Sequence, residues 1–380
     1  MLYPVLNAEA FNTGKINDFN QVGIRAIDNQ TLEILLNFST PYFLGLLDHQ
    51  STFPVHQATI EKFGNIDTRG SDWTRAGNYI GNGSFTLKEW EQYRIIVVEK
   101  NPHYWDAAIV KLDEIHFHPI DQMATEERMF RTGQLHISYD MPLEKIATYK
   151  KENPDLLNSH PYFGTYFYDI NTSIFPFDNV NVRRALAMTI DRESIVKNIT
   201  KGGQIPAYTL TPPDTLGYTA RSKISYNIEK ARELLAEAGF PNGEGFPTIQ
   251  LLYNTLESHQ QIATAIQQMW KQALNIDITL HNQEWKVYLD SHKSLNYEIV
   301  RASWIGDYID PNTFLDMYIS DGGMNRTGWS NKEYDNLIAE ASITADQQNR
   351  YEFFQRAEEI LINEAPMIPI YTYSKNFLKS

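Results

Sequence analysis

The sequence contains no cysteine among its 380 residues. This absence excludes disulfide bonds, catalysis by a thiol, and zinc or iron–sulfur centres built on cysteine. No apolar run approaches the ~18 residues of a membrane-spanning helix. The first residues, Met1-Leu2-Tyr3-Pro4, show neither the basic nor the apolar segment of a secretory signal peptide. Taken alone, these absences indicate a chain that neither spans a membrane nor carries an export signal.

Basic residues are also in the minority. The chain has 33 Lys and Arg against 47 Asp and Glu, which gives a formal net charge of -14. Repulsion from phosphates opposes binding to nucleic acid or to anionic lipid, so we expect no nucleic-acid partner. Hydrophobic residues make up 42% of the chain, enough for a packed core, and the aromatic fraction is 13%. Such aromatic side chains pack in cores or line clefts.

Strand-like and helix-like segments alternate along the chain. At about 150 residues per domain, the length predicts two or three domains, and the alternation predicts an α/β fold. Expected strands include Ser84–Trp90, Arg94–Glu99, Thr248–Tyr253, Tyr297–Ser303 and Met367–Tyr373, and expected helices include Val180–Ile190, Arg192–Ile199, Ser258–Leu274 and Asn349–Glu364.

Sequence motifs for catalysis are missing. There is no Gly-x-Ser-x-Gly elbow, no phosphate-binding loop, and no dinucleotide-binding glycine pattern after a strand. His116 and His118 lie on one face of a predicted strand, which is a spacing that can hold a metal. An exposed polar strand face is the favoured interpretation, because no third ligand is indicated nearby. We therefore expect no catalytic residues, no metal and no cofactor.

Two charged features near residue 300 allow more than one interpretation. Asp307 and Asp310, together with Glu284, resemble the carboxylates of a glycosidase, although acids in such positions are usually solvated loop residues. Arg301 lies in the middle of the strand expected at Tyr297–Ser303. If that strand is buried, the arginine needs a carboxylate partner, which either the protein or a ligand supplies.

A run of residues in the middle of the chain carries a family resemblance. The segment Asp178–Arg192, preceded by Thr165–Asn171, is similar to the signature region of the oligopeptide-binding proteins of ABC transporters, which are bacterial extracellular solute-binding proteins of the peptide/nickel group. Further segments agree in the family's order: Gly81–Phe85, Leu87–Trp90, Glu99–Asp106, Ile205–Tyr208, Thr211–Pro213, Trp304–Tyr308 and Ala365–Tyr371.

The resemblance implies a two-lobed, periplasmic-binding-protein-like (type II) fold. It assigns residues 1–78 to the remnant of an extra small domain, 79–171 to part of the first lobe and 172–380 to the second lobe. Because the family begins and ends with segments that this chain lacks, the resemblance implies truncation at both ends. It also implies weak or absent peptide binding by this chain alone. For the intact protein it implies a periplasmic or extracytoplasmic, membrane-associated location.

The resemblance also assigns binding residues. Asp307 matches the position that takes the peptide's α-ammonium group, and Arg301 matches a position that meets the peptide's carboxylate. Other matches lie at the carboxylate end, in the walls of side-chain pockets or in the cleft: His259, Trp285, Trp304, Tyr373 and Tyr166. His292 and Lys293 depart from the usual basic arrangement, which leaves the preferred peptide length open.

The expected function is the solute-binding component of an ABC importer. In that role the chain captures short peptides and delivers them to the permease subunits, as a monomer and without catalysis. Alternatives with the same fold are receptors for murein peptides, nickel or haem. Alternatives from other classes are a secreted carbohydrate hydrolase that uses Asp307 and Glu284, and a chaperone-like protein that binds unfolded chains.

Overall fold

The structure is a computed structural model that describes residues 2–380. It contains two compact units, one made of the residues up to Leu46 together with His136–Ser380, and the other of Leu47–Leu135. The lobe boundaries expected from the sequence, at residues 78 and 171, remain a prediction. Met1, at which the first expected segment begins, lies outside the described residues.

A six-stranded mixed sheet forms the centre of the larger unit, with strand order β7-β11-β6-β10-β8-β9. β10 pairs parallel with β8, and β8 pairs parallel with β9, whereas β6 is antiparallel to both β10 and β11. The strands are β6 (Leu157–Ile170), β7 (Ile205–Pro206), β8 (Ile249–Asn254), β9 (Ile278–Gln283), β10 (Ile299–Ile305) and β11 (Met367–Leu378).

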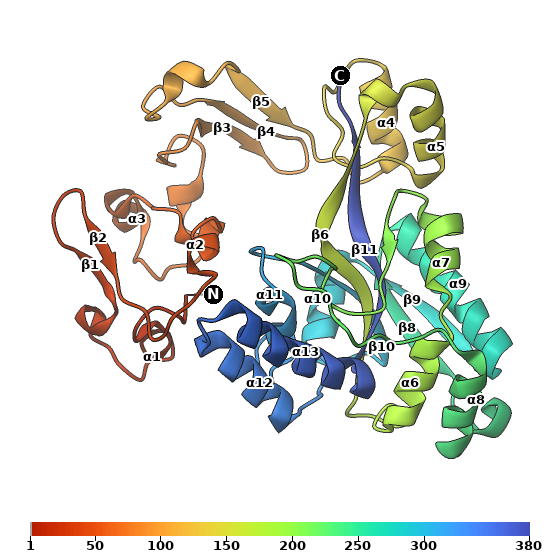
Figure 1. The fold of residues 1–380 in the computed structure, drawn as a ribbon. Coiled ribbons are helices and arrows are strands. Elements are labelled where there is room, and N and C mark those ends of the chain that lie inside the picture. Colours follow the sequence, from red (N-terminus) through yellow and green to blue (C-terminus); the bar gives the residue numbers. More distant parts are fainter. Residues whose placement is uncertain (1) are drawn as a thin grey trace. The chain divides into compact units, whose positions relative to one another are not determined.

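Helices cover both faces of this sheet (Figure 1). One core contains side chains of α6, α8 and α9, and the other contains side chains of α11, α12 and α13. Successive residues of β6 enter opposite cores, Tyr166 and Tyr168 the first and Phe167 the second. The helices are α5 (Leu143–Glu152), α6 (Val180–Met188), α7 (Arg192–Ser194), α8 (Ile228–Glu237), α9 (Glu257–Leu274), α10 (Trp285–Lys293), α11 (Asn312–Leu315), α12 (Lys332–Ile343) and α13 (Gln347–Glu364).

Capping residues explain where the long helices begin. The side chain of Asn179 accepts a hydrogen bond from the Asn181 N–H at the start of α6, and Asp346 accepts one from the Asn349 N–H at the start of α13 (both 2.9 Å). The helix expected at Val180–Ile190 is therefore confirmed. The helix expected at Arg192–Ile199 is also present, although only its first turn, α7, is α-helical and the rest, Ile195–Thr200, is a π-helix.

β6 and β11 form a long antiparallel ribbon. Their register runs from Met367 opposite Asp169 to Leu378 opposite Leu157, with two irregularities between Pro369 and Ser374. The last strand was expected to end at Tyr373, and this long-range pairing extends it to Leu378. In Figure 1 the ribbon continues past the other strands of the sheet. It carries three of the tyrosines that surround Arg301.

The remaining elements are short. The larger unit also holds α1 (Ala8–Asn12), β1 (Ile24–Ala26), β2 (Leu32–Ile34) and α2 (Phe43–Leu46). The smaller unit has a three-stranded antiparallel sheet of β3 (Phe85–Glu91), β4 (Ile95–Lys100) and β5 (Glu114–Phe117), with α3 (Gln57–Phe63) and α4 (Met123–Arg131). Across residues 2–380, every helix is too short or too polar to cross a lipid bilayer.

A buried ion pair joins α13 to the loop after β10. Both Nη atoms of Arg350 donate to the Asp310 carboxylate at 2.7 Å. The side chains are 2% and 4% exposed, and the guanidinium also lies over the rings of Tyr42 and Phe354. A two-pronged contact of this kind fixes the loop that follows β10.

We expect Asp310→Asn to lower the free energy of unfolding by about 3–5 kcal/mol, because it leaves the Arg350 charge buried without its partner. Urea denaturation followed by circular dichroism measures the change. Glu333→Gln is the matched control, because its pair with Arg356 is more than half exposed on both sides. That substitution is expected to cost less than about 1 kcal/mol. Equal losses in the two variants would contradict the structural role of the Asp310–Arg350 pair.

Candidate functional site

Arg301 lies in the middle of β10, and its side chain is buried with 6% exposure. One Nη atom donates to the Tyr373 hydroxyl at 2.8 Å, and the other donates to Asn254 Oδ1 at 3.3 Å. Its Nε is buried without a hydrogen-bond partner. The sequence left open whether the protein itself supplies a carboxylate, and among the described residues no carboxylate forms an ion pair with Arg301.

Aromatic side chains surround this cation. The guanidinium carbon lies 4.7 Å from the centre of the Tyr166 ring, a cation–π geometry. Tyr166 stacks on Tyr371 with ring centres 4.7 Å apart, and Tyr373 meets both rings edge-on. The strand pairing accounts for this grouping, because Tyr371 lies opposite Tyr166 and Tyr168 lies opposite Arg301.

His259, near the start of α9, completes the group. Its Nδ1 lies 3.4 Å from the Tyr166 hydroxyl, and its side chain is 6% exposed. Burial, with the positive charge of Arg301 adding to it, holds the pKa of His259 well below its usual value of 6.5. The imidazole is therefore neutral at physiological pH. The structure thus brings together four residues that the sequence singled out: Arg301, Tyr166, Tyr373 and His259.

Asp307 lies at the other end of the same strand. Glycine is required just before it, because a Cβ on Gly306 would lie 2.2 Å from the Phe163 ring. The Asp307 N–H donates to Thr313 Oγ1 at 3.1 Å, which fixes the backbone of the turn, and the residue is exposed. β10 ends at Ile305, so Asp307 lies two residues beyond the strand, and its Cα lies at most about 20 Å from that of Arg301.

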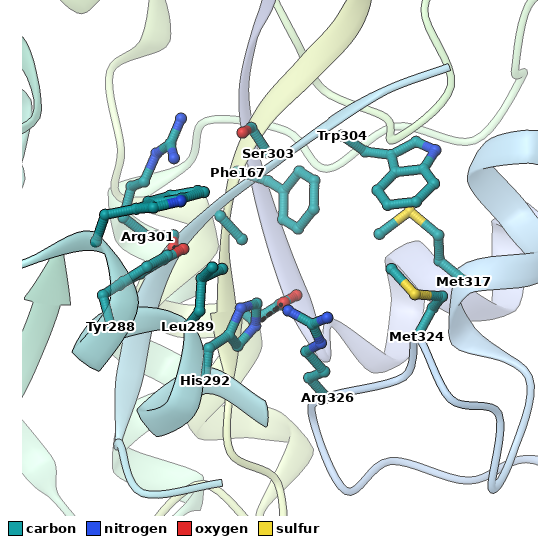
Figure 2. A pocket seen from close by; sticks show the side chains of 13 residues that line it. Phe167, Tyr288, Leu289, His292, Arg301, Ser303, Trp304, Met317, Met324 and Arg326 are labelled. Atoms are coloured by element: carbon teal, nitrogen blue, oxygen red, sulfur yellow. Dashed lines mark hydrogen bonds and ion pairs between the residues drawn. The ribbon is translucent and has the colours of Figure 1, made fainter. Parts of the chain in front are cut away.

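The two tryptophans line a separate cavity of about 150 Å³. Trp285 at the start of α10 stacks on Tyr288 with ring centres 5.4 Å apart, and Trp304 in β10 directs its indole N–H at Thr313 Oγ1, 3.4 Å away. Figure 2 shows both Met317 and Met324 near the Trp304 ring. Arg301 also contributes to the wall, although its guanidinium is bonded to Tyr373 and Asn254.

The sequence and fold are similar to those of known proteins. Residues 5–326 match the family described as bacterial extracellular solute-binding proteins, family 5 middle. The oligopeptide-binding protein OppA of Bacillus subtilis is 37% identical over all of this chain and 70% of its own length. The periplasmic oligopeptide-binding protein OppA of Salmonella typhimurium is 37% identical over 93% of this chain and 65% of its own length.

The chain belongs to this family of solute-binding proteins. Among solved structures, the murein tripeptide binding protein MppA of Escherichia coli has a TM-score of 0.91 at 36% identity, covering 100% of this chain and 74% of MppA. Haemophilus influenzae OppA in complex with RPPGFSPFR has a TM-score of 0.88 at 33% identity, covering 99% of this chain and 74% of OppA. These neighbours confirm the two-lobed, type II binding-protein fold class. The relatives are solute-binding proteins with periplasmic or extracellular roles.

Membership of the solute-binding family makes the hydrolase alternative less well supported. Glu284 accepts a hydrogen bond from the Lys286 N–H at 2.9 Å and so caps α10. Asp310 is held by Arg350. Two of the three acids that suggested a glycosidase therefore have structural partners, and the relatives are named for binding.

The histidines that suggested a metal site are engaged or exposed. His116 Nε2 lies 2.9 Å from Glu114 Oε2, and His118 is exposed. Over residues 2–380 the structure contains no group of three His, Cys, Asp or Glu side chains arranged to hold a metal ion.

Sequence reasoning missed several residues of the site. Asn254 and Tyr371 contact the Arg301 group, and Asp169 and Arg326 line the tryptophan cavity. His292, which the resemblance had marked only as a departure from the family, lines this cavity too. Asn254 had a detectable signal, because it directly follows an expected strand and side chains at strand ends gather along one edge of a parallel sheet. Arg326 had none, since it lies in a loop without periodicity.

The depressed pKa of His259 predicts acid sensitivity of the fold. The unfolded chain binds a proton at His259 as pH falls below about 6.5 while the folded chain does not, so stability present at neutral pH is lost on acidification. Between pH 7.5 and 5.5 this loss is on the order of 1 kcal/mol. Urea unfolding at both values is expected to show a smaller acid loss in His259→Gln than in the unaltered chain. The exposed His118→Gln is the control, and identical pH dependence in all three proteins would refute the assignment.

Proposed function

We propose that this chain is the solute-binding component of an ABC importer and captures short oligopeptides through their α-ammonium, backbone and carboxylate groups. Family membership supports the binding role, and relatives that cover the whole chain are named as oligopeptide-binding proteins. The chain spans 65–70% of the length of these curated relatives. The observation that carries the proposal is the buried Arg301 guanidinium, which no carboxylate among residues 2–380 neutralises.

A peptide carboxylate suits Arg301 on physical grounds. A guanidinium is always protonated, and burying it costs free energy unless an anion or good acceptors surround it. Neutral hydroxyl and amide oxygens now serve two of its nitrogen atoms, and Nε has no acceptor. A carboxylate accepts two parallel N–H bonds from this planar fork, and the attraction strengthens where water is excluded.

Asp307 supplies the opposite charge for the other end of the peptide. A carboxylate at the exposed end of β10 suits an α-ammonium group, which donates charge-assisted hydrogen bonds. The span of at most about 20 Å between the Cα atoms of Asp307 and Arg301 accommodates an extended peptide of up to about five residues, or fewer where the reach of the arginine side chain is counted. The order of the two charges also sets the direction of the peptide along β10.

The rest of the proposal concerns the setting in which this binding occurs. The intact protein works outside the cytoplasm, in the periplasm or at the outer side of the membrane, and delivers peptides to the permease subunits. It acts as a monomer and releases its ligand chemically unchanged. Murein peptides are a second ligand class, favoured by the TM-score of 0.91 to a murein tripeptide binding protein.

Trialanine, its C-terminal amide and its N-acetyl derivative test the two charged ends by calorimetry. We expect the unaltered chain to bind trialanine at least about tenfold more tightly than either blocked peptide, a difference of about 1.4 kcal/mol per lost charge contact. Arg301→Gln is expected to abolish the preference for the free carboxylate only. Asp307→Asn is expected to abolish the preference for the free ammonium only.

Each variant serves as the control for the other. For each protein, the affinity ratio of trialanine to its amide and the affinity ratio of trialanine to its N-acetyl derivative are measured on the same preparation. Titration continues to millimolar peptide, because the family resemblance implies that this chain alone binds peptides weakly or not at all, whereas the proposal expects measurable binding. Mass spectrometry checks that the recovered trialanine is intact. Absence of binding to every peptide, or ratios that neither variant changes, would refute the proposal. Cleaved peptide would favour a hydrolase instead.

A further inference from the structure

The tryptophan cavity contains a second cation that the proposed capture of peptide ends does not use. Arg326 lies in the loop between Tyr318 and α12, and Figure 2 shows its side chain reaching into the cavity beside His292. Its Nε is buried without a hydrogen-bond partner, and its guanidinium makes no ion pair with any described residue. This buried Nε needs an acceptor that the described residues do not provide.

Asp169 is the only carboxylate among the described residues that line the cavity, and it is already engaged. Its Oδ1 accepts a hydrogen bond from the Tyr318 hydroxyl at 2.7 Å, and its Oδ2 lies 2.9 Å from His292 Nε2. Its side chain is 5% exposed. Asp169 therefore serves the tyrosine and the histidine, and Arg326 keeps its charge without a contacting anion.

The backbone on both sides of Arg326 is fixed. The Tyr297 hydroxyl donates to the Arg326 carbonyl, and the Thr327 carbonyl accepts from both the N–H and the hydroxyl of Thr172. Asn325 donates to two backbone carbonyls at 2.9 and 3.1 Å, those of Trp329 and Tyr318. The backbone that carries Arg326 is thus fixed before a ligand arrives, so binding does not have to order this loop.

The shape and the other walls of the cavity restrict the ligand. A volume of about 150 Å³ corresponds to about five water molecules, or to the five heavy atoms of a glutamate side chain beyond Cα. Apolar side chains make up much of the wall: Phe167, Leu289, Trp304, Met317 and Met324. Such a wall suits two methylene groups, and thioethers adapt to their shape.

We propose that this cavity receives an acidic side chain, glutamate above all, of a bound peptide, and that Arg326 determines this preference. The proposal rests on the peptide-binding function and adds a class of substrate to it. The methylene groups lie against the apolar wall, and the carboxylate accepts paired N–H bonds from Arg326. The terminal carboxylate is not the occupant, because Arg301 receives it.

The test uses C-terminally amidated alanine tripeptides that carry a single Glu or Gln at each position in turn. Glutamine has the same shape without the charge, and amidation removes the terminal carboxylate as a competing anion. At one position we expect the Glu peptide to bind at least about tenfold more tightly than its Gln partner, which corresponds to about 1.4 kcal/mol. Fluorescence of Trp285 and Trp304 provides a second readout of side-chain entry.

Arg326→Gln is expected to reduce this Glu/Gln ratio to less than about twofold, and Arg326→Lys to retain part of it because lysine keeps the charge without the planar fork. Any general loss of stability in a variant affects the Glu and Gln peptides equally and so cancels in their affinity ratio, since both peptides are measured on the same variant. Arg356→Gln is the matched control, because Arg356 is 56% exposed and pairs only with the surface residue Glu333 in the described structure. It is expected to keep the full ratio.

The outcomes separate this inference from the function on which it rests. Binding of trialanine with a Glu/Gln ratio near one at every position overturns the glutamate preference and leaves peptide capture in place. A ratio that persists in Arg326→Gln overturns the role of Arg326. Failure of all peptides, trialanine included, overturns peptide capture and the glutamate preference together.

Discussion

The burial of one positive charge in the middle of β10 constrains the rest of the site. Arg301 is 6% exposed and has no counter-ion in the protein, so its environment must offset the loss of hydration. Three groups surround the guanidinium. They are the hydroxyl of Tyr373 from β11, the side-chain amide of Asn254 from β8 and the ring face of Tyr166 from β6. Each of these contacts is neutral. Arg301 therefore keeps a net positive charge to which an incoming anion can bind. An ion pair within the protein would have neutralised that charge.

This requirement explains the order of the strands. Placing Arg301 within reach of Tyr166, Tyr373 and Asn254 requires β10 to lie between β6 and β8, with β11 beyond β6. β10 brings Arg301 to the tyrosine cluster, and both Arg301 and Trp304 contribute to the wall of the tryptophan cavity. Helices cover both faces, so neither set of residues is freely solvated. One strand thereby supplies a carboxylate-binding group and the wall of a side-chain cavity.

Local signals and family resemblance predicted different parts of this arrangement. Hydrophobic spacing was sufficient for α6 and α13, because that signal lies within one segment of the chain. The continuation of β11 to Leu378 depends on pairing with β6, about 200 residues away in the chain, and no local pattern encodes it. The grouping of Arg301 with His259 followed only from the resemblance. The isolation of Arg326 could not be predicted, because it depends on Asp169 being engaged by residues from two other segments.

The two arginines differ in what their surroundings allow. Arg301 is held from three sides by neutral acceptors, so a ligand oxygen there competes with bonds that already exist and must offer more than a hydroxyl does. A full carboxylate charge meets that condition, whereas a backbone carbonyl does so weakly. Arg326 has no such bonds to give up, so even a modest acceptor gains there. The first site therefore selects for charge at a terminus that every peptide has, and the second discriminates among side chains. General capture and side-chain preference are thus assigned to two different arginines, both of which contribute to the wall of the tryptophan cavity.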